Sequence, residues 1–319
     1  MIIDRIEFFK LQKQFSNIPF SQSEEWLNSL GNLDNVKFYI DDVNDPCICA
    51  WGILYKRRFI GKHLLIDGIT KKNIEIKTIK SFFLNIISND YSIVEVSDID
   101  FYKETFEIGV RQAGFFRPIL SLCPLTLIVE LNKDLNFHRN WRRNVKKAIS
   151  EGCLFYEERR PTIENLEIFI SLFNQLKNRK ELGFSLNSES LLKLFACDNY
   201  KLFYVKDKNG IFLSGRIIYI NGDRSYDIFA ANSNDGILKG AAYYIQEKIL
   251  YYLKDNGVSI FDYGRISPSA DNMNNIYNAK SYSGGFPVQY NGQWSYSKKK
   301  YLYMLYEIYK FLVRKQRRY

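Results

Sequence analysis

Residues 201–231 read KLFYVKDKNGIFLSGRIIYINGDRSYDIFAA, three apolar segments separated by two short polar turns. The turns at 208–210 (KNG) and 221–223 (NGD) are typical of β-hairpins, so this stretch predicts an antiparallel meander with strands at 201–205, 211–220 and 225–231. Helical periodicity over 240–256 and an apolar strand at 258–263 follow it. Strands and helices in this order predict a mixed α/β (α+β) fold.

The same alternation extends over the rest of the chain. Further strands are expected at 36–40, 47–55, 59–66, 92–96, 125–131, 154–157 and 286–290. Further helices are expected at 71–88, 102–114, 162–179, 188–196 and 301–315. A chain of 319 residues is long enough for two domains. The charged stretch 132–152 predicts a first domain of residues 1–137, completed by a C-terminal helix at 296–319, and a second domain of residues 138–295.

Composition indicates a folded protein with a basic surface. Hydrophobic residues make up 46% of the chain and charged residues 25%, which excludes long disorder. The formal net charge of +10 favours polyanionic partners such as phosphates, nucleic acid or an acidic membrane, without choosing among them. The five cysteines have no framework spacing and complete no zinc set, so free thiols and no metal site are expected. A charged start and the lack of an apolar run of about 20 residues predict a cytoplasmic protein without a transmembrane segment, with peripheral contact at the inner face of the membrane as an option.

The segment HRNWRRNVKKA at 138–148 predicts a helix with one strongly basic face. Its cations follow helical spacing and share that face: Arg139, Arg142, Arg143, Lys146 and Lys147. Apolar residues are expected on the opposite face, against a core: Trp141, Val145, Ala148 and Ile149. Aligned cations repel one another unless an anion lies nearby. The segment is therefore either a solvated basic face or a platform for a nucleotide diphosphate, a coenzyme or an RNA backbone.

A second segment predicts a place for an anionic donor. The strand DIFAAN at 227–232 leads into DGILKGAAYY at 235–244, where a glycine-containing turn opens a helix. Such a helix start offers free backbone N–H groups to an anion, and acyl-CoA-binding acetyltransferases use a comparable turn. The expected donor-binding residues are Asn232, Lys239, Gly240 and Ala241.

A third segment carries candidate catalytic residues. The strand IFDYGRI at 260–266 brings Asp262 and Arg265 to its C-terminal end, where open α/β folds build sites. Lys280 follows in the loop NIYNAKSYSGG at 275–285, which is rich in tyrosine and glycine. The alternative is a structural salt bridge between Asp262 and either Lys280 or Arg265.

Taken in order, these segments resemble the FemAB/FemX family of non-ribosomal peptidyl transferases and related acyltransferases. The resemblance rests on NWRRNVKKA at 140–148, FDYGRI at 261–266, and YNAKS at 277–281 before the glycine pair at 284–285; it covers mainly residues 138–294. It implies two tandem GNAT-like domains with a cleft between them, and acyl transfer to an amine on a nucleotide- or lipid-linked cell-envelope precursor. Lys280 matches the family lysine near the reacting carbonyl, and Ala279 stands where an aromatic residue is usual.

Two departures from the family pattern bear on the substrates. The chain has no long coiled-coil arm, and Asn187 stands where FemX-like sequences place a basic residue for muropeptide phosphates. Some relatives with the double fold transfer an acyl group from acyl-CoA to a nucleotide-linked amino sugar for surface polysaccharide. That activity is our first expectation, with acyl-CoA as co-substrate and no permanently bound cofactor.

Two alternatives remain open. One is a FemX-like peptidyltransferase that uses aminoacyl-tRNA to add an amino acid to a peptidoglycan precursor, the only case in which tRNA is a partner. The other is a non-catalytic protein that binds RNA or a membrane through the basic helix, the tyrosines and residues 298–300.

Direct attack of the amine is the expected mechanism, because the two histidines, His63 and His138, complete no nucleophilic triad. Asp262 is the candidate base, and Lys280 would stabilise the oxyanion or the departing group. The candidate ligands of the acceptor's phosphates are Arg139, Arg142, Arg143, Lys146 and Arg265.

Overall fold

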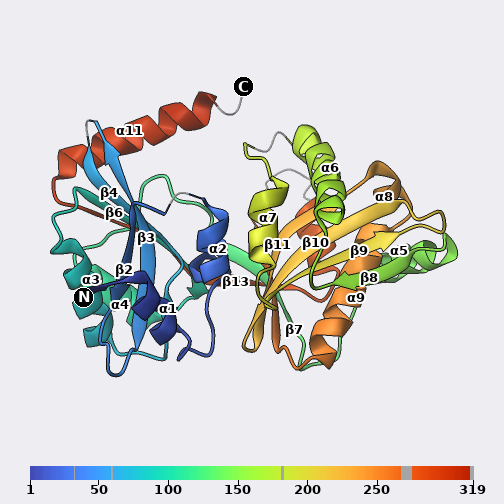
Figure 1. Ribbon diagram of the computed structural model, residues 1–319, viewed down its shortest axis with the longest axis horizontal. Coiled ribbons are helices and arrows are strands. Elements are labelled where there is room, and N and C mark those ends of the chain that lie inside the picture. The colour runs from blue at the N-terminus through green and yellow to red at the C-terminus, as the bar shows by residue number, and fades with distance from the viewer. Residues whose placement is uncertain (32, 59, 181–182, 267–274, 317–319) are drawn as a thin grey trace. The chain divides into compact units, whose positions relative to one another are not determined.

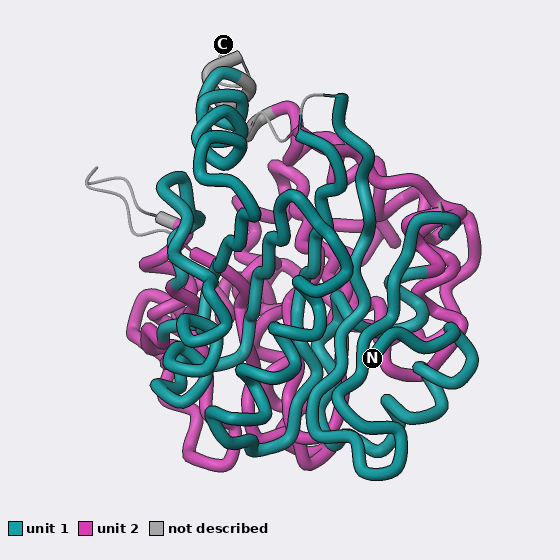
Figure 2. The backbone as a smooth tube through the Cα atoms, turned by 90° about the vertical axis from the view of Figure 1, so that its left-hand side faces the viewer, with its two compact units in different colours: residues 1–27, 32–124, 289–319 teal, residues 28–31, 125–288 magenta. Residues whose placement is uncertain are grey.

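A computed structural model describes residues 1–31, 33–58, 60–180, 183–266 and 275–316. The chain forms two compact units, each with its own set of strands and its own core (Figures 1 and 2). Unit 1 comprises Met1–Leu27, Asn32–Pro124 and Gln289–Tyr319, and unit 2 comprises Asn28–Gly31 and Leu125–Val288. The mixed α/β class expected from the sequence is confirmed.

Unit 1 is built on a twisted sheet with strand order β1-β2-β3-β4-β6-β13, with β5 paired to β3. Its strands are β1 (Ile2–Ile3), β2 (Val36–Ile40), β3 (Ile48–Arg57), β4 (Gly61–Asp67), β5 (Thr70–Lys71), β6 (Ile93–Phe101) and β13 (Phe286–Ser297). Its helices are α1 (Arg5–Gln12), α2 (Glu24–Ser29), α3 (Ile76–Ile87), α4 (Glu104–Gln112) and α11 (Lys300–Gln316). Alternate side chains of the strands point to opposite faces, so α3 and α4 cover one face around Phe83, and α1 and α2 cover the other around Phe8.

Unit 2 has strand order β7-β12-β11-β10-β9-β8. Its strands are β7 (Leu125–Glu130), β8 (Leu154–Glu158), β9 (Tyr200–Lys206), β10 (Phe212–Asn221), β11 (Arg224–Asn232) and β12 (Ile260–Arg265). Its helices are α5 (Arg139–Ser150), α6 (Ile163–Lys180), α7 (Ser188–Leu194), α8 (Asn234–Leu238), α9 (Ala241–Asp255) and α10 (Asn275–Ser281). Helices α5 and α9 pack together on the core, and α6 lies on β10 and β11, where Gly215 leaves room for the ring of Phe169.

The two units share one connectivity. In each, an antiparallel meander is followed by helix and a parallel strand: β2-β3-β4 leads through α3 to β6, and β9-β10-β11 leads through α9 to β12. An antiparallel strand then pairs with that fourth strand, β13 in unit 1 and β7 in unit 2. Two tandem domains of one architecture are what the sequence predicted.

The division between the units lies elsewhere than the charged stretch 132–152. Residues 125–137, expected in the first domain, belong to unit 2, because β7 pairs with β12 through Val129 and Phe261. Residues 289–295, expected in the second domain, belong to unit 1, because β13 pairs with β6 through Trp294 and Val96.

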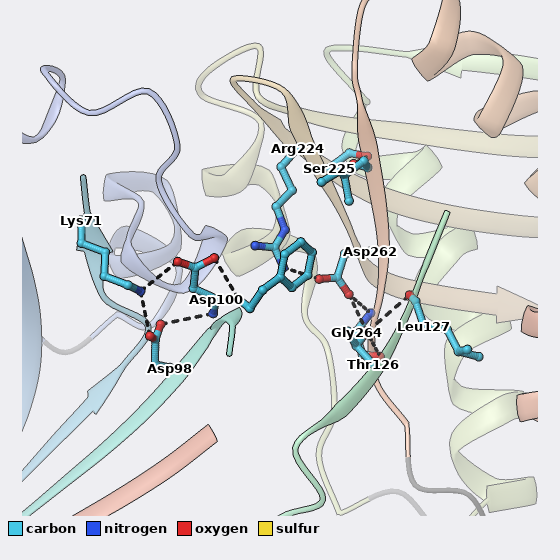
Figure 3. Close-up of polar contacts among 11 residues, drawn as sticks. Lys71, Asp98, Asp100, Thr126, Leu127, Arg224, Ser225, Asp262 and Gly264 are labelled. Atoms are coloured by element: carbon cyan, nitrogen blue, oxygen red, sulfur yellow. Dashed lines mark hydrogen bonds and ion pairs between the residues drawn. The ribbon is translucent and has the colours of Figure 1, made fainter. Parts of the chain in front are cut away.

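Buried polar residues account for two errors in the expected elements of unit 1. A helix was expected from residue 71, but Thr70–Lys71 forms β5, and α3 begins at Ile76. The Lys71 side chain is 5% exposed and is ion-paired with Asp98 and Asp100 at 2.7 and 3.1 Å (Figure 3). Strand β6 therefore continues through these carboxylates to Phe101, beyond the expected end at 96.

Candidate active site

A cavity of about 570 Å³ lies within unit 2. Most of its wall is apolar or aromatic: Trp141, Leu176, Ala230, Ile237, Ala242, Tyr243, Tyr263, Ile276 and Ala279. Its polar side chains are those of Arg216, Asp227, Asn232, Gln246 and Lys280. A largely apolar cavity with a few convergent polar groups is the usual form of a small-molecule site.

Lys280 lines this cavity from α10. Its Nζ donates to the Tyr263 carbonyl at 2.9 Å and lies 5.1 Å from the centre of the Tyr263 ring. Burial lowers the pKa of the Lys280 ammonium below its ordinary value; the Asp227 carboxylate opposes this shift, and the Arg216 guanidinium adds to it. A lysine whose charged form is disfavoured within a cavity is a candidate catalytic residue.

The sequence SGG at 283–285 determines where α10 ends and so where Lys280 lies. The buried Ser283 hydroxyl donates to the Lys280 carbonyl at 2.6 Å and accepts from the Tyr263 hydroxyl at 2.7 Å. Gly284 has a φ of +89°, and a Cβ on Gly285 would lie 2.8 Å from the Lys280 carbonyl oxygen. Glycine is therefore required for the backbone after α10 to approach Lys280 this closely.

Arg216 of β10 and Asp227 of β11 form a buried ion pair in the cavity wall. The sequence analysis did not select either residue. Asp227 Oδ1 and Arg216 Nε have no hydrogen-bond partner among the residues that the structure describes. A buried polar atom without a partner costs roughly 1–3 kcal/mol, so a ligand that pairs with these two atoms is expected.

Gln246 of α9 is a further polar group that the sequence analysis missed. Its side chain lines the cavity, and the residue is 1% exposed. Within the described part of the chain, neither its Nε2 nor its Oε1 has a hydrogen-bond partner. The only sequence signal was a glutamine on the apolar side of an amphipathic helix, between Ile245 and Ile249.

Helix α5 contributes to the cavity from one side and is strongly basic on the other. Trp141 lines the cavity, and its Nε1 donates to Glu247 Oε2 at 3.0 Å. The predicted cations are all exposed, and no ion pair between them and another described residue is present: Arg139, Arg142, Arg143, Lys146 and Lys147. Trp141, Val145 and Ala148 are buried as expected, whereas Ile149 is 59% exposed.

Asp262 is not suited to the role of base that the sequence suggested. It is fully buried, and its Oδ2 accepts from Arg224 Nη2 at 2.6 Å (Figure 3). Its Oδ1 accepts from Thr126 Oγ1 at 2.6 Å and from the Gly264 N–H at 3.0 Å. The carboxylate therefore ties β12 to β7 and β11, and the structural alternative is correct in kind, with Arg224 in place of Lys280 or Arg265.

The expected donor residues are only partly brought to the cavity. Asn232 lines it and accepts from Ser214 Oγ at 2.6 Å. Lys239 is instead ion-paired with Asp207 at 3.3 Å, so its charge is already compensated within the fold.

Gly240 and Ala241 have a packing role. A Cβ on Gly240, whose φ is +77°, would lie 2.4 Å from the Asn144 carbonyl oxygen of α5. Ala241 is fully buried in the same core. These two small residues let α9 begin directly against α5, and the next residue, Ala242, is the one that lines the cavity.

Arg265, a predicted phosphate ligand, ends β12 opposite Thr126 of β7. It is half-buried and does not line the cavity as the structure describes it. Its position gives no support to a role beside Lys280.

Several solved structures share the fold of this chain. No protein-family model matches the chain, and no curated protein matches it. Among solved structures, FemX matches 96% of this chain and 99% of its own, with 16% identity and a TM-score of 0.77. The chain has the FemX fold. L-PGS from Bacillus licheniformis matches 95% of this chain and 96% of its own, with 16% identity and a TM-score of 0.65.

A conserved protein of unknown function from Bacteroides thetaiotaomicron matches 92% of this chain and 95% of its own, with 9% identity and a TM-score of 0.58. The double fold implied by the resemblance to FemAB/FemX sequences is thus confirmed over nearly the whole chain. In the part of this FemX-like chain that the structure describes, no helix is long and apolar enough to cross a membrane, and no cluster of side chains could hold a metal ion.

Proposed function

We propose that this chain is an N-acyltransferase in which Lys280 acts at the reacting carbonyl. The observation that carries the proposal is the cavity of unit 2, where the lowered pKa of the half-buried Lys280 coincides with an Arg216–Asp227 pair in which two atoms have no partner among the described residues. The FemX fold supports the same class, since the sequence resemblance to that family includes the segment that carries Lys280.

The proposed reaction is direct. The acceptor's amine nitrogen attacks the acyl carbon, a C–N bond forms, the bond to the donor's sulfur or oxygen breaks, and the amine gives up one proton. The Lys280 ammonium stabilises the oxyanion and can protonate the leaving group. Asp227 replaces Asp262 as the candidate base, because Asp227 lines the cavity and its Oδ1 has no partner among the described residues.

For the acceptor we propose a nucleotide-linked amino sugar, a precursor of cell-surface polysaccharide. Its phosphates require cations whose charge is not already compensated, and the exposed face of α5 supplies five of them. The opposite side of α5 supplies Trp141 to the cavity. One helix would thus hold the anionic part of the acceptor while the sugar's amine reaches Lys280.

For the donor, acyl-CoA remains the first candidate, on the basis of the apolar wall of the cavity. The Lys239–Asp207 ion pair removes the cation that was expected to meet the pyrophosphate. The apolar wall at Ile237 and Ala242, beside the start of α9, supports a thioester donor because it could contact the acyl chain.

An aminoacyl group on tRNA is the second candidate, and the polar atoms of the cavity favour it. A saturated acyl chain offers no donor to Asp227 Oδ1 and no partner to the Gln246 amide. An α-ammonium offers three N–H donors, so an aminoacyl group could donate to both Asp227 Oδ1 and Gln246 Oε1. Under this alternative the acceptor would be a peptidoglycan precursor.

The experiment is acyl transfer measured by mass spectrometry, with a panel of acyl-CoAs and UDP- or dTDP-linked amino sugars, and separately with charged tRNA. Lys280→Ala should lower kcat by about 10²–10³-fold, and Lys280→Arg should recover part of the loss. The matched control is Lys248→Ala, an exposed lysine on α9. Activity of Lys280→Ala equal to that of the wild type would refute the proposed role.

Two further arms of the experiment separate the substrates. Arg142→Glu with Arg143→Glu should raise KM for the nucleotide-linked acceptor and leave the donor's KM nearly unchanged. RNase should leave activity intact if the donor is acyl-CoA. Loss of activity with RNase, restored by charged tRNA, would select the aminoacyl donor.

A further inference from the structure

Helix α11 presents its apolar side outward. Its exposed large side chains, each between 47% and 62% accessible, are Tyr301, Met304, Leu305, Ile308, Tyr309, Phe311 and Leu312. The spacing of 301, 305, 308 and 312 places those four along one stripe of the helix. A surface helix of a globular protein normally turns such a stripe toward the core, whereas these four side chains are exposed.

The inward side of α11 is polar and is attached to the sheet through Glu95 of β6. Tyr306 donates to Glu95 Oε2 at 2.7 Å, and Lys310 Nζ donates to Glu95 Oε1 at 3.0 Å. The buried His63 contacts the same carboxylate at 3.0 Å. Burial tends to raise the pKa of Glu95, but these partners outweigh it and lower the pKa to about 2. The carboxylate therefore remains charged and holds the helix.

The loop before β7 also holds the inward side of α11, through two backbone hydrogen bonds. The backbone N–H of Ile119 donates to the Tyr303 hydroxyl at 3.0 Å, and that of Leu120 donates to Glu307 Oε2 at 2.9 Å. Rotating α11 to bury its apolar stripe would break these contacts and leave buried polar groups without partners. The stripe is thus held outward by the fold, and the exposed Ile119 side chain lies on the loop that contacts α11.

The charge around this helix indicates what covers the stripe. Residues 298–319 contain eight lysines and arginines and one acidic residue, Glu307. Lys298 and Lys299 are exposed immediately before α11, and the exposed Lys300 is its first residue; of these three, Lys298 is ion-paired with Asp90 at 2.6 Å. Four more basic residues, at 314, 315, 317 and 318, follow the apolar part of α11 in the sequence. Two copies of such a segment would repel each other, whereas an anionic surface would attract both ends.

We propose that α11 is a docking surface for an anionic lipid bilayer, with its apolar and aromatic stripe in the interfacial layer and its basic ends on the headgroups. Leucine, isoleucine and aromatic side chains between basic residues have the composition of interfacial helices. Here the helix is already folded and oriented by Glu95, so binding requires no ordering of the segment. The proposal does not depend on the acyltransferase activity.

The test is co-flotation of the full chain with vesicles. Equimolar phosphatidylcholine and phosphatidylglycerol vesicles should carry the protein, and pure phosphatidylcholine vesicles should carry much less. Leu305→Glu with Ile308→Glu should weaken partitioning by about tenfold or more. Ile6→Glu with Ile163→Glu, a change of two exposed isoleucines at 84% and 54% on other helices, is the matched control and should float like the wild type.

Three outcomes would overturn the proposal. One is equal flotation of the Leu305→Glu/Ile308→Glu variant and the wild type, with circular dichroism showing both folded. Another is loss of flotation on Arg142→Glu/Arg143→Glu alone, which would place the lipid contact on α5. The third is a dimer in sedimentation velocity that Leu305→Glu/Ile308→Glu dissociates, without vesicle binding by the wild type, which would identify a second copy as the partner.

Discussion

Arg224 Nη2 lies 2.6 Å from Asp262 Oδ2, and the Asp262 side chain has no exposed surface. Arg224 opens β11 and Asp262 lies in β12, the two strands that run parallel in unit 2. The same carboxylate accepts from Thr126 of β7, so three neighbouring strands share one buried charge cluster (Figure 3). Asp262 therefore acts on the fold, and through it on the strand end that precedes Lys280.

Asp262→Asn should destabilise the protein by about 3 kcal/mol or more, because it removes the charge opposite a buried guanidinium. Urea unfolding would measure this loss, with Asp255→Asn, an exposed change at the end of α9, as the matched control. The folded fraction of Asp262→Asn should keep kcat near the wild-type value. A normal stability combined with a thousandfold loss of kcat would instead restore Asp262 as the base.

Gln246→Leu should have opposite effects on stability and function. The substitution removes two buried polar atoms that lack partners, so the free protein should become more stable by roughly 1 kcal/mol. The donor's KM should rise if the amide pairs with the acyl group. Thermal unfolding without ligand and steady-state kinetics would measure the two effects.

The control for Gln246→Leu is Gln12→Leu in unit 1. Gln12 is similarly buried, but its Nε2 donates to the Gln22 carbonyl at 3.0 Å and to Thr70 Oγ1 at 3.2 Å. Its replacement should destabilise the protein. If both leucine variants are destabilised equally, Gln246 is an ordinary structural residue.

Gly285→Ala should reduce activity more than stability. Its new Cβ would lie 2.8 Å from the Lys280 carbonyl oxygen, so the end of α10 must move and take Lys280 with it. A displacement of about 1 Å at a catalytic group can cost on the order of 10²-fold in rate. Gly183→Ala, where the added Cβ meets nothing within 4 Å, is the control and should match the wild type in kcat.

Glu95 should make stability depend on acid pH. Its folded pKa of about 2 lies below the ordinary value of 4.5, so its contribution is present above pH 4.5 and is lost as the pH falls toward 2. A shift of this size corresponds to about 3 kcal/mol. Glu95→Gln should therefore be less stable than the wild type at pH 7, and the difference should shrink below pH 4.5. A difference that stays constant down to pH 2 in denaturant titrations would contradict the assignment.

The local pattern of the sequence was sufficient for much of unit 2. The NGD turn at 221–223, between two apolar runs, predicts the hairpin of β10 and β11, and the periodicity of residues 138–148 predicts α5 with its basic side outward. These features depend on neighbours within a few residues, whose influence local sequence records. Element ends differ more: β13 continues seven residues past the expected end at Tyr290, through the polar Asn291 and Gln293, because residues 290–297 pair with β6.

The candidate site shows where local pattern stops being informative. Lys280 was found through a short motif, but Arg216, Asp227 and Gln246 come from three different elements. In the sequence, Arg216 and Asp227 are ordinary charged residues of two strands, and only the pairing of β10 with β11 places them together. Asp262 was misassigned for the same reason: its partners Arg224 and Thr126 are 38 and 136 residues away.

The sequence alone determined the class of the protein, its meander, its basic helix and the motif around Lys280. The fold class, the meander and the basic helix follow from residue spacing, which sets which face of a helix or strand a side chain occupies. The role of the motif around Lys280 came from the resemblance to the FemAB/FemX family. Tertiary structure alone decided which polar groups have partners. Asp262 and Lys239 have them within the fold, whereas Asp227 Oδ1 and the Gln246 amide lack them among the described residues. Tertiary structure also decided that α11 keeps its apolar stripe outward. The physical reason is that burial and hydrogen bonding depend on contacts between distant segments, and no local pattern records them.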